Sequence, residues 1–382
     1  MPLERARRKA GPLALLVRMA RYNRVVARSK SSLKSRIGEN LQEIDRTLEA
    51  AGLVRKRRAT PAGITARLRG LRKAPASKQE LTRPAPTPVI SGNGVGLLEI
   101  PAWRDKGLRW LWHGFSTRLG GVSRAYCGES AQGEMNLGFT AGDTREAVEH
   151  NRRLLAEAVT GSGATPIVGL RQFHSNLVLI ANQVDAGRGR LHKADGVITA
   201  IPGMLLAIQT ADCIPVLVAD RRQRVVSAFH AGWRGTVKRI VQLGVGRMRI
   251  EFGSRAEDLI AAIGPGAGQC CYAVGEEVLS EFESQFSYAR ELVREVFDSD
   301  PVRTKYPMLF LTQRAPGHSP IGPALHLDLI EANRRQLLEA GLKASEISVT
   351  GGCTNCHTNL FFSHRASRGH AGRMMSVIGI RG

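Results

Sequence analysis

The chain has 382 residues, of which 43% are hydrophobic and 23% are charged, a composition that excludes a wholly disordered protein and a collagen-like fibre. No run approaches the roughly 20 apolar residues of a membrane-spanning helix, and six cysteines are too few for a disulfide scaffold, which favours the reducing cytoplasm. The net charge of +22 lies mostly in residues 1–90, which hold 22 Lys and Arg against 6 Asp and Glu, whereas the other residues hold 33 against 27.

Residues 1–90 are predicted to form a basic N-terminal extension that is partly helical or disordered. Apolar residues recur at three- and four-residue steps over 33–51, which indicates an amphipathic helix. The basic run Arg55–Arg58 follows, and then the proline-rich Arg83–Pro88, which is typical of a linker. Clustered Lys and Arg could contact nucleic acid or an anionic membrane. A solvated extension is favoured instead, and Tyr22 as its only aromatic residue gives base stacking little support.

Residues 91–382 are predicted to form a single domain in which short β-rich runs alternate with helices. The expected helices are Thr144–Val159, Thr236–Met248, Gly275–Phe286 and Asp328–Ala340. The expected strands are Met204–Gln209, Pro215–Ala219, Val225–Phe229, Leu259–Ile263 and Ser348–Thr350. Asp143 or Thr144 is expected to cap the first helix, and Asp328 the last. Because hairpins are mixed with helices, the fold class is α/β (α+β), a mixed-sheet sandwich with flanking helices rather than a doubly wound parallel sheet.

Two apolar runs that flank the polar turn Asp220–Arg224 predict a β-hairpin. With a turn centred on Arg222, residue 214 faces residue 230 and residue 213 faces residue 231. Cys213 and His230 then lie on neighbouring strands at the open end of the hairpin, within about 5–8 Å. That separation suits a shared metal ion or a thiolate–imidazole pair, although a slip of one residue would reverse the facing.

His174, just before the apolar run Leu177–Ala181, is a third candidate ligand. Two imidazoles and one thiolate suit a zinc ion that keeps its fourth position open for water or substrate. However, the separations of 39 and 17 residues match no closed zinc-finger pattern. From spacing alone, two hydrogen-bonded histidines and a buried thiol are the simpler interpretation.

Two glycine-containing loops each carry an arginine that could bind an anion. Ala231–Thr236 contains Arg234, and the predicted helix that starts at Thr236 would direct its free N–H groups toward the same place. Gly114–Ser123 contains Arg118 two residues before a pair of glycines. Either guanidinium could bind phosphate in a bidentate manner, or could simply pair with a carboxylate.

A third cysteine motif lies near the C-terminus, where Cys353 and Cys356 precede His357. Cys-x-x-Cys-His is the motif of covalent haem attachment, but nothing in the sequence supports export. A zinc ribbon would need a second cysteine pair, and Cys270 and Cys271 are adjacent and poorly spaced for that role. Cys353 is therefore predicted to be structural and Cys356 incidental.

A series of motifs resembles one known family, in order from about residue 95 to 380. These motifs are Phe115–Ser123, Asn136–Gly138, Gly142–Asp143, Gln172–His174, Ala194–Gly196, Thr210–Pro215, His230–Gly235, Ile263–Pro265, Cys353–Thr354, Phe362–Arg365 and Gly372–Arg373. On these motifs the chain is identified as a member of the laccase-domain family of bacterial purine nucleoside phosphorylases, also labelled polyphenol oxidase or peptidoglycan editing factor. The N-terminal 90 residues have no counterpart in the family pattern, and 298–322 is expected to be an enlarged loop.

The resemblance implies a zinc site made by His174, Cys213 and His230, and a sandwich similar to cysteine hydrolases and bacterial deamidating toxins. It also implies that adenosine, inosine and methylthioadenosine are cleaved by phosphate, which gives the free base and ribose 1-phosphate or methylthioribose 1-phosphate. Deamination of adenosine is implied as a side activity.

The remaining site residues are assigned by the chemistry of these reactions. Arg118 and Arg234 are the candidates for phosphate, and Asn136 is counted with them as a substrate-binding residue. Asp212 is counted with the catalytic residues and is expected to hydrogen-bond near the metal thiolate rather than to act as a base.

Two other functions stay open. A cysteine-dependent amide hydrolase acting on cell-wall precursors would use Cys213 as nucleophile and His230 as base. A copper polyphenol oxidase is disfavoured because multicopper sites need many histidines, commonly in His-x-His pairs. This chain has ten histidines and no such pair, so zinc is predicted rather than copper.

Overall fold

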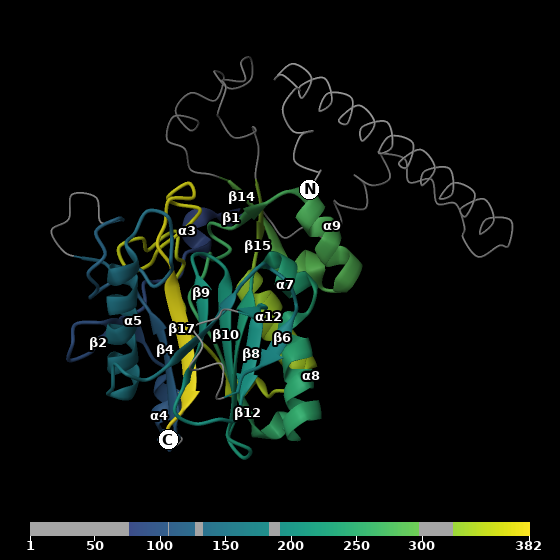
Figure 1. Ribbon diagram of the computed structural model, residues 1–382. Coiled ribbons are helices and arrows are strands. Elements are labelled where there is room, and N and C mark those ends of the chain that lie inside the picture. Colours follow the sequence, from purple (N-terminus) through teal and green to yellow (C-terminus); the bar gives the residue numbers. More distant parts are fainter. Residues whose placement is uncertain (1–75, 106, 127–132, 183–191, 298–323) are drawn as a thin grey trace, which may run out of the picture. The chain divides into compact units, whose positions relative to one another are not determined.

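The computed structural model describes residues 76–105, 107–126, 133–182, 192–297 and 324–382 (Figure 1). All of them belong to one compact unit, Arg72–Gly382. The predicted helix over 33–51, the basic run Arg55–Arg58 and the predicted enlarged loop over 298–322 lie outside the described residues.

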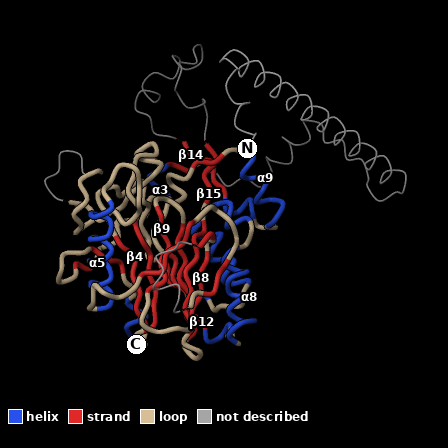
Figure 2. Tube along the Cα trace, in the orientation of Figure 1, coloured by secondary structure: helices blue, strands red, loops and turns tan. Residues whose placement is uncertain are grey.

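Within the described ranges, the strands form two large mixed sheets and one smaller sheet (Figure 2). The seven-stranded sheet has the order β2 (Val89–Ile90), β3 (Gly96–Leu98), β4 (Leu111–Ser116), β17 (Met374–Ile380), β9 (Leu205–Thr210), β5 (Ile167–Arg171) and β7 (His192–Lys193). The six-stranded sheet has the order β16 (Ile347–Val349), β12 (Leu259–Ile263), β10 (Ile214–Asp220), β11 (Val225–Ala231), β8 (Gly196–Thr199) and β6 (Val178–Ile180). The small sheet has the order β1 (Ala76–Ser77), β14 (Val293–Phe297), β15 (Ala324–Leu327) and β13 (Ala273–Val274).

Helices cover the outer faces of the two large sheets, as Figure 1 shows for α5 on one side and α8 on the other. The described helices are α3 (Lys78–Leu81), α4 (Pro101–Asp105), α5 (Arg145–Thr160), α7 (Trp233–Val237), α8 (Ile240–Phe252), α9 (Glu276–Gln285) and α12 (Leu329–Glu339). Side chains along β10 alternate between two hydrophobic cores. Val216 and Val218 pack toward α8 and α12, whereas Leu217 and Ala219 pack between the sheets. The predicted mixed-sheet sandwich with flanking helices is therefore confirmed.

The predicted strands and helix caps are confirmed, and one predicted helix is wrong. Each expected strand is present with its ends within two residues of the prediction. Thr144 accepts a hydrogen bond from the N–H of Ala147, and Asp328 accepts one from the N–H of Glu331. The helix expected over Thr236–Met248 is instead two helices, because Arg239 takes a left-handed backbone conformation (φ 58°) between α7 and α8.

Residues 76–90, which the sequence assigned to the extension, contribute to the sheets where the structure describes them. β1 pairs with β14, and β2 pairs with β3. Helix α3 begins with a capping box, in which Ser77 and Glu80 each bond the other's backbone N–H. These contacts fix residues 76–90 against the domain that carries the rest of the described chain.

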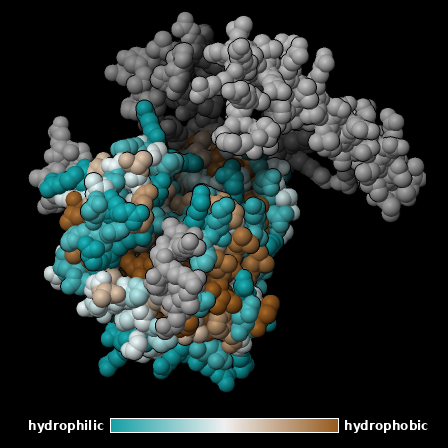
Figure 3. All heavy atoms as spheres, viewed as in Figure 1, coloured by the Kyte–Doolittle hydropathy of each residue, from teal (hydrophilic) through white to brown (hydrophobic). Residues whose placement is uncertain are grey.

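Exposed apolar side chains gather along β6 and α8 at one edge of the six-stranded sheet (Figure 3). They are Leu177, Ile180, Leu243 and Ile250. None of the helices in the described ranges is long and apolar enough to cross a membrane.

Candidate functional site

The β10–β11 hairpin carries two of the candidate ligands. Asp220 pairs with Val225, and its carboxylate accepts hydrogen bonds from the N–H groups of Arg222 (2.8 Å) and Gln223 (2.9 Å). The loop between the paired residues therefore has an even number of residues, and its centre falls between Arg222 and Gln223. The predicted register is wrong by one residue for that reason, yet Cys213 and the end of β11 still lie together at the open end.

Three donor side chains meet at that end. Cys213 Sγ lies 3.8 Å from His174 Nε2, and the rings of His174 and His230 are 5.0 Å apart between centroids. One ligand atom from each residue lies within 4.8 Å of the other two. His174 (φ 61°) and Asp212 (φ 91°) both have left-handed backbone conformations, which persist only where the surroundings enforce them.

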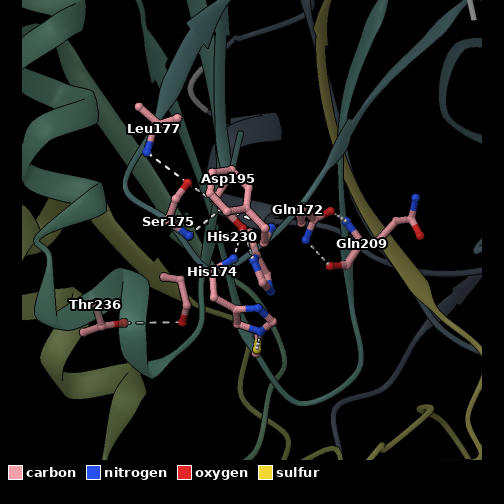
Figure 4. Close-up of polar contacts among 11 residues, drawn as sticks. Gln172, His174, Ser175, Leu177, Asp195, Gln209, His230 and Thr236 are labelled. Atoms are coloured by element: carbon pink, nitrogen blue, oxygen red, sulfur yellow. Dashed lines mark hydrogen bonds and ion pairs between the residues drawn. The ribbon is translucent and has the colours of Figure 1, made fainter. Parts of the chain in front are cut away.

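Asp195, directly before β8, holds His174 and His230 in place (Figure 4). Its fully buried carboxylate accepts hydrogen bonds from the N–H groups of Phe173, His174 and Ser175 and from the Ser175 hydroxyl. It also contacts His230 Nδ1 at 2.8 Å, which leaves Nε2 as the ring nitrogen available to the site. One carboxylate thus fixes both histidines.

The charges of the site are coupled. Burial alone would raise the pKa of Cys213, but the charge of His230 and hydrogen bonds from His174 and His230 lower this pKa to about 6. Burial alone would lower the pKa of His230, but the Cys213 thiolate and Asp195 raise it to about 9. Burial of Asp195 is likewise outweighed by hydrogen bonds from His230 and Ser175, so its pKa lies below its ordinary value. The thiolate form of Cys213 is therefore favoured at neutral pH.

The three donors fit one metal ion. Thiolate sulfur and imidazole nitrogen are common zinc donors, and three protein ligands leave a fourth position for water or substrate. Buried Gly232 keeps the space clear: a Cβ there would lie 2.9 Å from Cys213 Sγ and 3.0 Å from His174 Cδ2. The hydrogen bond that Asp195 accepts from His230 Nδ1 is the kind of contact that orients a ligating imidazole.

Asp195→Asn is expected to lower the metal affinity of this site by about 10–100-fold. The carboxylate accepts every hydrogen bond it makes to Phe173, His174 and Ser175, so an amide NH₂ would face at least one donor. Competition with a chelator measures the affinity, and Asp258→Asn, in the turn before β12, is the matched control. An unchanged affinity in Asp195→Asn would show that Asp195 does not position the ligands.

A cavity of about 540 Å³ opens over the three donors, a size within the range of small-molecule sites. Its walls include Trp233 and Tyr272 and three guanidinium groups, from Arg234, Arg365 and Arg373. Arg234 lies over the Trp233 ring and Arg365 over the Tyr272 ring, at 4.4 and 4.5 Å from the ring centres. Among the described residues, none of the three has a carboxylate partner for its guanidinium. The cavity is therefore suited to an anion.

Arg118 and Asn136, predicted to bind phosphate or substrate, do not line this cavity. Arg118 pairs with Glu134 and donates to backbone carbonyls. Fully buried Asn136 donates to Asp143 and accepts from the N–H of Arg373. The polar groups of Arg118 and Asn136 form hydrogen bonds within the fold. Asn136 is connected to the cavity only through the hydrogen bond that it accepts from the backbone N–H of Arg373.

Asp212, predicted to hydrogen-bond near the thiolate rather than to act as a base, lines the cavity next to Cys213. Its two carboxylate oxygens accept hydrogen bonds from the Thr354 hydroxyl and the N–H of Arg365, both at 2.7 Å. Asp195, not Asp212, hydrogen-bonds a candidate ligand. Asp195, Arg365 and Arg373 were not among the predicted site residues, although each stands in one of the family motifs.

A second group of side chains corrects the prediction for the C-terminal cysteines. The Sγ atoms of Cys270, Cys271, Cys353 and Cys356 all lie within 4.8 Å of one another. The prediction that Cys356 is incidental is wrong, because β12 and β16 run in parallel and bring the loops that follow them together. Adjacent cysteines on one loop can therefore meet a Cys-x-x-Cys pair on the other.

Comparison with known proteins identifies the family of the chain and solved structures with a similar fold. Residues 112–381 match the family described as multi-copper polyphenol oxidoreductase laccase. The chain is similar to the crystal structure of YlmD from Geobacillus stearothermophilus, with a TM-score of 0.60 and 31% identity, over 78% of this chain and 100% of that one. This likeness agrees with the mixed α/β fold.

Two relatives carry names that bear on chemistry. A purine nucleoside phosphorylase of Bacteroides thetaiotaomicron is 33% identical over 271 residues, which are 70% of this chain and 90% of the relative. Adenosine deaminase RL5, from an unknown prokaryotic organism, is 30% identical over 270 residues, which are 69% of this chain and 92% of the relative.

Proposed function

Since the chain belongs to the multi-copper polyphenol oxidoreductase laccase family, whose relatives include a purine nucleoside phosphorylase, we propose that it is a purine nucleoside phosphorylase. The proposed substrates are adenosine, inosine and methylthioadenosine, with phosphate as the second substrate. The observation that carries the proposal is one cavity that combines a His–Cys–His group with three guanidiniums that have no carboxylate partner among the described residues.

We propose zinc as the ion that His174, Cys213 and His230 hold. When bound, zinc would supply a Lewis acid that stabilises negative charge on the departing purine. The family description names copper, but multicopper chemistry needs several histidine-rich sites. Of the two candidate metal groups among the described residues, one contains two imidazoles, those of His174 and His230, and the other consists of cysteines alone.

The side chains of the cavity suit phosphorolysis. An oxygen of phosphate attacks C1′ of the ribose while the bond from C1′ to the purine nitrogen breaks. The electron pair of that bond leaves with the base, and the proton lost by phosphate ends on the base. Arg234, Arg365 and Arg373 would hold the phosphate in line with the breaking bond. Trp233 and Tyr272 offer aromatic surface beside the purine.

We propose adenosine deamination as a side activity of the same cavity, as the name of one relative suggests. The oxygen of water would bond to the ring carbon that carries the amino group. The bond from this carbon to the amino nitrogen would break, one proton of water would leave with that nitrogen as ammonia, and the other would stay on the purine. This activity is distinguished from phosphorolysis because it needs no phosphate.

The test is base release by the purified, metal-loaded full chain from inosine and adenosine, with and without phosphate. Phosphate-dependent formation of free base and ribose 1-phosphate would support the proposal. Absence of base release from folded, zinc-loaded protein would overturn it. Hydrolysis of cell-wall amides together with alkylation of Cys213 would then favour the cysteine-dependent amide hydrolase, and oxidation of phenols by copper-loaded protein would favour the oxidase.

Arg373→Ala is expected to raise the KM for phosphate by about 10–100-fold, because a hydrogen bond to a charged group contributes about 1.5–3 kcal/mol. The KM for inosine should change far less. Arg222→Ala, at an exposed position of the β10–β11 turn, is the matched control. Equal changes in both KM values, or none, would exclude Arg373 from the phosphate site.

A further inference from the structure

We propose that Cys270, Cys271, Cys353 and Cys356 form a second metal site, at which four thiolates bind one zinc ion in a closed, structural manner. The site is separate from the His–Cys–His group of the cavity and does not depend on the proposed phosphorylase activity. Among the described residues, these are the two groups in which at least three metal-binding side chains lie within reach of one ion.

The positions of the sulfur atoms carry the proposal. Cys356 Sγ lies 3.3 Å from Cys271 Sγ and 3.6 Å from Cys270 Sγ, and all four sulfurs lie within 4.8 Å of one another. Four sulfurs around one zinc ion, each at about 2.3 Å in a tetrahedron, are about 3.8 Å apart. The observed cluster therefore needs only small side-chain adjustments to enclose an ion.

The surroundings of the sulfurs are those of a closed site. Cys270, Cys271 and Cys353 are buried, Cys356 is half-buried, and Leu81 packs against the group. The N–H of Gly268 donates to Cys353 Sγ at 3.2 Å, a contact that favours thiolate over thiol. With four protein ligands, no position remains for substrate, so a bound ion would have a structural role.

A disulfide is the alternative that the test must separate. A disulfide joins two sulfurs and would leave two thiols, whereas one ion engages all four.

The backbone forms two short turns that present the cysteines in pairs. In one, the N–H of Cys271 donates to Gly268 O. In the other, the N–H of His357 donates to Cys353 O.

A metal ion here would connect segments that reach the cavity. Thr354, between the two C-terminal cysteines, donates to Asp212, the residue next to Cys213. On the other side, His357 Nε2 contacts Arg83 O at 3.0 Å. Loss of the ion should therefore loosen the loop after β16 and residues 82–83 together.

The experiment uses the full chain carrying Cys213→Ser, so that the His–Cys–His group contributes no thiolate and a thiolate–metal signal reports on the second site. Reduced protein is loaded with Zn²⁺, freed of excess metal and analysed for metal per chain, and a Co²⁺-loaded sample is examined for sulfur-to-cobalt charge-transfer absorption. We expect one equivalent of zinc and a strong thiolate–cobalt signal. Adding Cys356→Ser leaves three thiolates, and it should weaken the signal and lower the zinc content.

Three results would overturn the proposal. They are no zinc in the Cys213→Ser chain, zinc content unchanged by Cys356→Ser, and an unreduced chain lighter by two hydrogens with a disulfide among these cysteines. The cobalt spectrum is recorded on an intact cluster, so it decides the matter even if Cys356→Ser fails to fold. Base release by the wild-type chain is assayed separately, so failure of this proposal leaves the phosphorylase proposal standing.

Discussion

Replacing Cys213 by alanine is expected to abolish phosphate-dependent base release, with a loss in kcat/KM for inosine of about 10³-fold or more. Cys213 provides the thiolate of the His–Cys–His group, and its sulfur lies 3.8 Å from His174 Nε2. Without it, two imidazoles alone must hold the ion, and His230 loses the negative charge that raises its pKa. Steady-state kinetics and metal content together measure the effect, and the metal content should fall by one equivalent.

The matched control for this prediction compares two histidines, one of the two inside the group and one on α5 outside it. His174→Ala should behave like Cys213→Ala, whereas His150→Ala, at an exposed position on α5, should keep full activity and metal. Retained activity in Cys213→Ala would place the reaction elsewhere. Retained metal with lost activity would instead point to Cys213 as a nucleophile, as the amide-hydrolase alternative requires.

Local patterns were sufficient to predict the hairpin and the meeting of its two ligand residues. Strand alternation and a polar turn define a hairpin whatever its exact register. The register itself was wrong by one residue because it depends on how the Asp220 carboxylate organises the turn. Cys213 and His230 tolerate this error because Cys213 directly precedes β10 and His230 is the last residue but one of β11, so a shift of one residue leaves both at the open end of the hairpin.

Contacts between distant segments could not be read from the sequence. Asp195 fixes His174 and His230 through hydrogen bonds that span 21 and 35 residues, and its motif Ala194–Gly196 does not reveal these distant partners. The four-cysteine group depends on the parallel pairing of β12 with β16, about 85 residues apart. Linear spacing was therefore a poor guide to which cysteines are neighbours.

The break between α7 and α8 shows a different limit. Helical periodicity continues through residues 236–248, but Arg239 takes φ 58° and its side chain donates to Gln242 and Glu339. Tertiary contacts outweigh the local helical preference at this position. The consequence for the site is that a helix begins at Trp233, directly after Gly232, rather than at Thr236.

Gly232→Ala is the second substitution with a large expected effect, a loss of about 10²-fold in kcat/KM. The backbone of Gly232 (φ −67°, ψ 167°) suits alanine, so the effect would come from the added methyl group. That carbon would lie 2.9 Å from Cys213 Sγ and 3.0 Å from His174 Cδ2, closer than van der Waals contact. The Cys213 sulfur and the His174 ring must then move away from the new methyl group by several tenths of an ångström. The metal affinity should therefore fall together with the activity.

Gly246→Ala separates this effect from a general cost of removing a glycine. Gly246 lies within α8, and a Cβ there would meet nothing within 4 Å. Alanine should therefore stabilise the chain by about 0.5–1 kcal/mol and leave activity unchanged. Thermal unfolding, metal titration and base release on both variants complete the comparison. If Gly232→Ala kept its metal and its activity, the close approach of backbone to donors would have no functional meaning, and the His–Cys–His group would have to bind its ion in another arrangement.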